Sequence, residues 1–286
     1  MKDLNFELSI LCRRNRDGSY STRGQRYARM QRHANTLQEL GFYHMHATSL
    51  KPKHVTALVE HWIANGNTPG TLQNYMTDIR WWAEKVGKTH LVHPSNEHYG
   101  IPSRDHTPRD KAQFLSEDAF LRIKNDYVRM SVRLQQAFGL RREESIKFRP
   151  SFADQETFIR LKGSWTKGGR PRDIPIAELS QREILDWIHE FVGSGSLIPS
   201  ECLYKHQLRR YEHYIEQARL NNLHGLRHGY AQRRYLKLTG RYPPSGGGLR
   251  FSELTKRQQE IDQEVRLKIS RELGHNRIEI TRVYLG

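Results

Sequence analysis

The sequence is poor in cysteine and acidic residues and has no long apolar segment, and each shortage excludes a class of protein. Cys12 and Cys202 are its only cysteines, so we expect neither a disulfide framework nor a cysteine-based zinc or redox motif. No apolar run approaches the ~18 residues of a transmembrane helix, and the first residues lack the pattern of a signal peptide. We therefore expect a reduced, cytoplasmic protein without a membrane partner.

The shortage of acidic residues leaves a large positive charge. The 286 residues include 47 Lys and Arg against 31 Asp and Glu, a formal net charge of +16. A chain this basic usually binds a polyanion, most often nucleic acid. The alternative is a basic surface that serves only solubility.

Histidine is plentiful, with 15 residues, so a metal site has to be considered. The pairs His44/His46 and His224/His228 have ligand-like spacing, but no third or fourth ligand lies near either pair in the sequence. We therefore expect no bound metal and no cofactor.

The pattern of apolar residues predicts a mainly α protein with a small β-sheet, built from two domains. Residues 1–90 form a helical domain with amphipathic segments at 22–40, 54–64 and 69–86. Residues 91–113 contain three prolines and many polar residues, which is typical of an interdomain linker. Residues 114–286 form the second domain, with Ser116 as the N-cap of its first helix.

The second domain mixes helices with one predicted hairpin. Residues 116–148 have a helical pattern, and so do 180–191. Residues 157–162 and 172–176 predict two strands joined by a glycine-containing turn that carries Lys167. Further along, 240–249 predicts a loop and 252–264 an exposed polar helix.

One stretch of the first domain is unusually basic in composition. Seven arginines and a single acid, Asp17, fall between residues 12 and 32. Four of the arginines recur every third residue and so spread over about half of the helix surface. We expect this face to contact DNA phosphates, with a solvated basic face as the alternative. The four residues are Arg23, Arg26, Arg29 and Arg32.

Four short motifs occur in order along the second domain, and a tyrosine follows the last of them. They are GLRREE at 139–144, KGG at 167–169, HGLR at 224–227 and LGH at 273–275, with Tyr284 nine residues after His275. Together they resemble the tyrosine recombinases, the family of phage integrases and Xer-like enzymes. The resemblance covers roughly 116–286, and residues 1–90 are similar to that family's core-binding domain.

The resemblance implies a role for each motif. Arg141 rather than Arg142 corresponds to the first catalytic arginine, and Glu144 to the acid that organises the site. Lys167 corresponds to the catalytic lysine, with Lys162 as the competing choice. The remaining catalytic residues implied are His224, Arg227, His275 and the nucleophile Tyr284.

Elementary chemistry is compatible with those roles. A phosphodiester under attack gains negative charge on its non-bridging oxygens, and two guanidinium groups bind such oxygens through paired, charge-assisted hydrogen bonds. Histidines add donors or shuttle a proton, and a lysine on a hairpin suits protonation of the leaving oxygen. Because tyrosine hydroxyls ionise near pH 10, the nucleophile needs positive neighbours or a base. With arginines supplying the charge, no divalent cation is required.

The resemblance therefore implies a site-specific DNA recombinase that forms 3′-phosphotyrosyl links. It would work as a homotetramer on two double-stranded attachment sites, with accessory DNA-bending or directionality proteins, to integrate or excise a mobile element of bacterial or phage origin. A type IB-like topoisomerase and a non-catalytic DNA-binding protein of the same fold are the alternatives.

Two features depart from the family pattern. The interval from Arg227 to His275 is long, which predicts an insertion at about 240–262 that contacts DNA or a neighbouring subunit, or else forms a solvent loop. Only two residues follow Tyr284, whereas many relatives continue into a helix that docks on a neighbouring protomer. We expect that this helix is absent or that the sequence is truncated.

Overall fold

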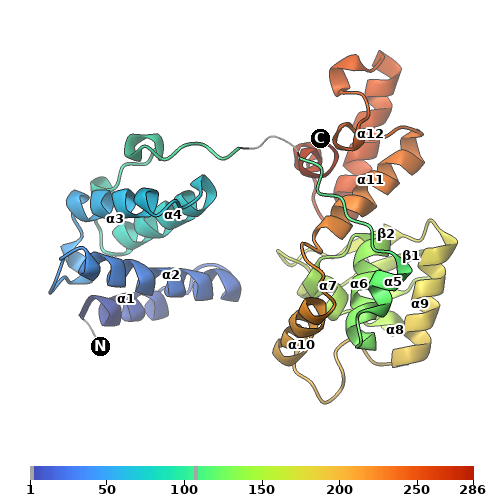
Figure 1. The fold of residues 1–286 in the computed structure, drawn as a ribbon, viewed down its shortest axis with the longest axis horizontal. Coiled ribbons are helices and arrows are strands. Elements are labelled where there is room, and N and C mark those ends of the chain that lie inside the picture. The colour runs from blue at the N-terminus through green and yellow to red at the C-terminus, as the bar shows by residue number, and fades with distance from the viewer. Residues whose placement is uncertain (1–2, 106–108) are drawn as a thin grey trace. The chain divides into compact units, whose positions relative to one another are not determined.

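The computed structural model describes residues 3–105 and 109–286. The chain divides into two compact units, Met1–His106 and Thr107–Gly286, shown in Figure 1. Among the described residues, helices dominate and the only sheet is one antiparallel strand pair, which confirms the predicted fold class. No helix in these ranges has the length and apolarity needed to cross a membrane.

The first unit packs amphipathic helices around an apolar core. The buried core includes Met30 and Leu37 from one helix, with Leu58, Met76 and Trp82 from the two that follow. Each predicted helix of this unit is present within two residues of its expected ends. The helices are α1 (Asp3–Arg14), α2 (Tyr20–Glu39), α3 (Pro52–Ala64) and α4 (Pro69–Lys85), with short 3₁₀ turns at Ala47–Ser49, Thr89–Leu91 and Glu97–Tyr99.

The predicted linker, 91–113, is only partly an extended connection. Val92 and Ile101 are buried in the core of the first unit, and the Arg104 guanidinium donates to the Gln73 side chain at 2.8 Å. The sequence did not indicate this packing, because Val92 and Ile101 are single apolar residues among prolines and polar residues and so form no periodic pattern. Residues 106–108 of the predicted linker lie outside the described residues.

The second unit surrounds two apolar cores. The larger core contains Phe138, Ile159, Ile174 and Tyr230, and the smaller contains Phe120. The predicted helix over 116–148 is interrupted, because Gly139 ends one helix with a left-handed conformation. The helices and strands of this unit up to residue 217 are α5 (Glu117–Leu121), α6 (Asp126–Phe138), α7 (Arg142–Ile146), α8 (Pro150–Ala153), β1 (Phe158–Leu161), β2 (Arg172–Pro175), α9 (Leu179–Val192) and α10 (Tyr204–Gln217).

The β1–β2 hairpin turns one arginine inward. Ile159 pairs with Ile174, and both are fully buried, so their face of the hairpin covers the core. Leu161 and its partner Arg172 lie on that same face, because side chains alternate along a strand. The Arg172 side chain is only 6% exposed.

Two long helices lie side by side in the C-terminal part of the chain (Figure 1). They are α11 (Gly225–Thr239) and α12 (Lys256–Glu272), and the short α13 (Arg282–Leu285) packs on α11. The prediction of an exposed helix at 252–264 was wrong in extent and in burial. Helix α12 starts later, runs further and buries Val265 and Ile269. Its many charged residues masked that buried stripe.

The predicted insertion is folded against its own unit. Residues 240–254 contain two 3₁₀ turns, Pro244–Gly246 and Phe251–Glu253, and the first of these contacts α13. Asp262, inside the first half of α12, is buried and bonded to the Tyr235 hydroxyl and to Arg266. A loop free in solvent is therefore excluded for this segment.

The chain enters the second unit across the start of α11. The Gln113 amide donates to the Gly225 carbonyl at 3.0 Å. A Cβ added at Gly225 would lie 2.5 Å from the Lys111 carbonyl oxygen, and one at Gly229 would lie 2.5 Å from that of Gln113. Glycine at both positions thus permits backbone to lie directly on this helix.

Candidate active site

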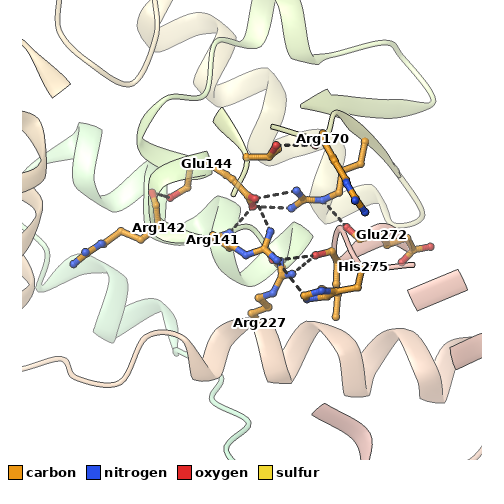
Figure 2. Close-up of polar contacts among 12 residues, drawn as sticks. Arg141, Arg142, Glu144, Arg170, Arg227, Glu272 and His275 are labelled. Atoms are coloured by element: carbon orange, nitrogen blue, oxygen red, sulfur yellow. Dashed lines mark hydrogen bonds and ion pairs between the residues drawn. The ribbon is translucent and has the colours of Figure 1, made fainter. Parts of the chain in front are cut away.

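Arg141 is held at a turn between two helices. Gly139 has a φ of +63°, and a Cβ there would lie 2.6 Å from the Tyr230 ring, so a side chain is excluded. Arg141 follows in extended conformation as the N-cap of α7, and its backbone amide donates to the Glu144 carboxylate at 2.7 Å. Figure 2 shows Arg142 pointing away from this cluster, and its guanidinium pairs with Glu212. This placement favours Arg141 as the site arginine.

Glu144 is the anion shared by two arginines. Its carboxylate is fully buried and accepts from Arg141 Nη1 at 2.8 Å and from Arg172 Nη1 and Nη2 at 2.9 and 2.6 Å. Burial opposes ionisation of Glu144, but the Arg172 hydrogen bonds and the two positive charges outweigh it and lower its pKa to about 2. Glu144 is therefore ionised at neutral pH and fixes the orientation of Arg141.

Arg227 is buried without a carboxylate partner among the described residues. It is 1% exposed, donates from Nη1 to the Gly139 carbonyl at 2.5 Å, and donates from Nη2 to the Leu273 carbonyl. Its Nε lies 3.3 Å from the Tyr284 hydroxyl. Burial lowers the pKa of Arg227 to about 10, so the side chain stays protonated at neutral pH. Its charge is balanced mainly by dipoles, which leaves it able to attract an anion.

His275 and a backbone carbonyl join the two arginines, as Figure 2 shows. The Leu273 carbonyl accepts from both Arg141 and Arg227, and His275 Nε2 lies 3.4 Å from Arg141 Nη2. Burial, together with the charges of Arg227 and Arg141, lowers the pKa of His275 to about 4. His275 is therefore neutral at pH 7 and has one nitrogen able to accept a proton.

Tyr284 lies within this cluster, on α13. It is 6% exposed, and its ring centroid is 4.7 Å from that of His228 and 6.4 Å from that of His275. Its hydroxyl is in contact with Arg227, as described above. The structure thus brings Arg141, Glu144, Arg227, His275 and Tyr284 into one connected set.

His224 is joined to the set only indirectly. It is the residue before α11, and its ring centroid lies 5.6 Å from that of His228, which in turn packs on Tyr284. Burial and the charge of Arg227 lower the pKa of His224. His224 is therefore a neutral group at the edge of the cluster.

The two candidate lysines differ in their surroundings. Lys162 Nζ lies 4.0 Å from the centre of the Phe152 ring, so its ammonium group makes a cation–π contact there. Lys167 is exposed in the loop between β1 and β2 and makes no hydrogen bond or ion pair with any described residue. Neither ammonium contacts the cluster.

Two residues of the site, Arg172 and His228, were not among the catalytic residues predicted from the sequence. Arg172 falls two residues before the buried Ile174, so strand alternation indicates its inward direction. His228 falls one helical turn after His224, which places both on one face of α11. His228 is 2% exposed, its Nδ1 has no hydrogen-bond partner, and burial lowers its pKa to about 4.

The four arginines predicted to contact DNA differ in how far other side chains of the first unit already bind them. Arg29 pairs with the buried Asp78, and Arg26 pairs with Asp17 and stacks over Trp81. Of the remaining two, Arg23 lies over the Tyr20 ring, and Arg32 is exposed. Arg32 is thus the one whose charge is most available to a ligand.

No group of three or more histidine, cysteine, aspartate or glutamate side chains within residues 3–105 and 109–286 is arranged to hold a metal ion.

Two family models match the chain. One, described as the N-terminal domain of phage integrases, matches residues 1–92, and one described as an integrase matches residues 107–233. A search of curated proteins finds no match.

Solved structures similar to this chain share its fold at low sequence identity. A lambda integrase dimer bound to a COC′ core site has 17% identity and a TM-score of 0.63, covering 99% of this chain and 77% of that one. The XerH site-specific recombinase bound to a palindromic difH substrate has 14% identity and a TM-score of 0.61, covering 99% and 81%. The Tn1549 transposon integrase in complex with circular intermediate DNA has 12% identity and a TM-score of 0.56, covering 100% and 96%.

Proposed function

Because this chain belongs to the phage integrase family of tyrosine recombinases and is a tyrosine-type DNA recombinase, we propose that Tyr284 is its nucleophile. The observation that carries the proposal is the contact between the Tyr284 hydroxyl and the buried Arg227, beside Arg141 and His275. A phenolic oxygen next to an uncompensated guanidinium is suited to attack an anionic phosphodiester, because the cation stabilises both reactants as charge develops.

The scissile phosphate binds, in this proposal, between Arg141 and Arg227. Both guanidinium groups already converge on the Leu273 carbonyl, and a phosphate oxygen is a stronger acceptor than a neutral carbonyl. Glu144 and Arg172 hold Arg141 in place, so little rearrangement is needed when the phosphate gains charge. Arg172 acts here as a positioning residue.

Proton transfer accompanies the strand cleavage. Tyr284 Oη attacks phosphorus, the bond from phosphorus to the 5′ oxygen breaks, and a 3′-phosphotyrosyl bond forms. The phenolic proton passes to a neutral histidine, for which His275 is the candidate. His224, also neutral, donates a further hydrogen bond to the phosphate. Lys167 protonates the leaving 5′ oxygen from its exposed loop. Attack by the 5′ hydroxyl of another strand reverses these transfers and rejoins the DNA without ATP.

The partners of this reaction are double-stranded attachment sites. We propose a homotetramer on two duplexes that exchanges strands through a Holliday junction to integrate or excise a mobile element in a bacterial cytoplasm, with accessory DNA-bending proteins. Support comes from the similar structures, which include a lambda integrase tetramer bound to a Holliday junction. The matched families favour this recombinase over a topoisomerase.

A covalent-adduct assay tests the proposal. Nicked suicide duplexes tiled across the DNA that flanks the gene are incubated with protein in EDTA, and adducts are resolved on denaturing gels. We expect an adduct at a defined position that is lost in Tyr284→Phe and kept in Tyr242→Phe, a change at an exposed tyrosine of the same unit. An adduct that persists in Tyr284→Phe, or that requires a divalent cation, would refute the proposed chemistry.

A further inference from the structure

The helix that carries Tyr284 is too short to hold itself in place. α13 has only four residues, and the last four carbonyls of any helix lack partners within it. The Tyr284 carbonyl is one of these, and it accepts from Ser245 Oγ at 3.1 Å. Ser245 belongs to the 3₁₀ turn at the start of the 240–254 segment. The 240–254 segment therefore supplies a hydrogen bond to a carbonyl that has no partner within α13.

Ser245 is in turn held by the helix that carries Arg227. Gln232, on α11, donates from Nε2 to Ser245 Oγ at 3.1 Å and to Asp110 Oδ1 at 2.8 Å. Its distance of 3.5 Å to the Tyr284 carbonyl is at the limit of a hydrogen bond, so its main effect on Tyr284 passes through Ser245. Because Ser245 Oγ accepts from Gln232, its hydroxyl proton remains available to donate to the Tyr284 carbonyl.

The residues after Tyr284 fit closely beneath the same turn. A Cβ added at Gly286 would lie 2.8 Å from the Ser245 backbone nitrogen and 3.0 Å from Pro244 Cβ. On the other side, Arg266 donates from Nη1 to the Gly286 carbonyl at 3.0 Å and from Nε to Asp262 at 2.7 Å. The backbone around Tyr284 is thus fixed between the insertion and α12.

From these contacts we infer that Ser245 is a positioning residue for the nucleophile, and that the 240–254 segment supports Tyr284 within its own chain. α11 then sets both ends of the tyrosine: Arg227 contacts the hydroxyl, and Gln232 through Ser245 fixes the backbone carbonyl. Loss of the Ser245 hydroxyl lets α13 shift, and the phenolic oxygen then spends less time in line with the phosphate. This inference rests on the proposed role of Tyr284.

The test compares three serine variants in single-turnover cleavage of a saturating suicide duplex. Ser245→Ala removes the hydroxyl, Ser245→Thr keeps it, and Ser252→Ala is the matched control, an exposed serine of the same segment with no side-chain hydrogen bond to a described residue. We expect Ser245→Ala to cleave about three- to tenfold more slowly, which is the range for one lost hydrogen bond. The other two variants should cleave at the wild-type rate.

Binding and stability separate positioning from a general structural defect. We expect the DNA dissociation constant of Ser245→Ala to stay at the wild-type value and its melting temperature to fall by no more than about 4 °C, the shift of one lost hydrogen bond, while its cleavage rate falls. A wild-type rate in Ser245→Ala, or an equal loss in Ser245→Thr, overturns the inference. A wild-type protein that forms no Tyr284 adduct on any duplex refutes the proposed function instead, so the two failures are distinguishable.

Discussion

Two largely covered arginines, one in each unit, are compensated in opposite ways. In the first unit, Arg29 lies against Asp78, a carboxylate that is 2% exposed and that, among the described residues, is bonded to that arginine alone. In the second unit, Arg227 is more deeply buried but faces two carbonyls and a phenol. Between these extremes, Glu144 divides one negative charge between Arg141 and Arg172.

This difference separates structural arginines from those available to a ligand. A guanidinium with its own buried carboxylate has its charge neutralised, and a phosphate gains little by approaching it. A guanidinium held by carbonyl dipoles keeps its charge while its geometry is fixed, which is the arrangement that stabilises a developing anion. The basic helix α2 and the candidate cluster around Arg141 and Arg227 are both arginine-rich, yet only the second arrangement leaves net positive charge in the interior.

The largest difference between the two arginines is expected when each is replaced by lysine. Arg227→Lys keeps the charge but loses the fork of donors, so we expect single-turnover cleavage to fall about 10²-fold or more. Arg29→Lys should change that rate by less than about threefold, because Asp78 already neutralises the charge at position 29 within the first unit. Rates on a saturating suicide duplex measure both, and equal losses would show that the way an arginine is compensated does not decide its function.

A second pair of variants removes the carboxylates. Glu144→Gln leaves Arg141 and Arg172 without their shared anion, and Asp78→Asn does the same to Arg29. We expect each change to lower the free energy of unfolding by on the order of 3 kcal/mol, as for other broken buried pairs. Only Glu144→Gln should also slow cleavage, by about tenfold, since Arg141 loses its fixed orientation.

Calorimetry of the unliganded protein, with cleavage measured well below the melting temperature, separates those two effects. The comparison fails if Asp78→Asn slows cleavage as much as Glu144→Gln while DNA binding is saturated.

The smallest expected effect concerns Arg32, the exposed arginine of α2. Arg32→Ala should weaken DNA binding about threefold and reduce the slope of log affinity against log salt by about 1, with no change in melting temperature. Glu39→Ala, at an exposed acid of the same helix, is the control and should not lower that slope. Fluorescence titrations between low and moderate salt measure the slopes. An unchanged slope in Arg32→Ala would mean that this helix face does not contact phosphates.

Patterns in the sequence were sufficient for the helices of the first unit that have a regular apolar stripe, for the hairpin and for the order of the site motifs. Helices with a clear apolar stripe, such as α3 and α4, were predicted closely because their periodicity is regular, and Pro69 marked the start of α4. The hairpin was predicted because its strands are bounded by turn residues. The site residues assigned from motifs remain predictions, although five of them lie in one connected set.

Contacts between distant residues could not be predicted in the same way. Ser245 and Tyr284 are 39 positions apart, and nothing in the composition of a glycine- and proline-rich segment indicates that it packs on a tail helix. Val92 and Ile101 were assigned to a linker because single buried side chains leave no periodic signal. The four arginines of α2 looked equivalent in sequence, whereas Asp17 and Asp78 make them different in the structure.

The Leu273 carbonyl has a consequence for genetics. It accepts from both Arg141 and Arg227 at the end of α12, yet it belongs to the backbone and is present whatever residue occupies position 273. Substitution of Leu273 in a mutational screen changes only its side chain, which lies in the apolar core, so any defect would be attributed to misfolding. Replacing the amide after it with an ester, by chemical synthesis, would weaken the acceptor while leaving every side chain intact.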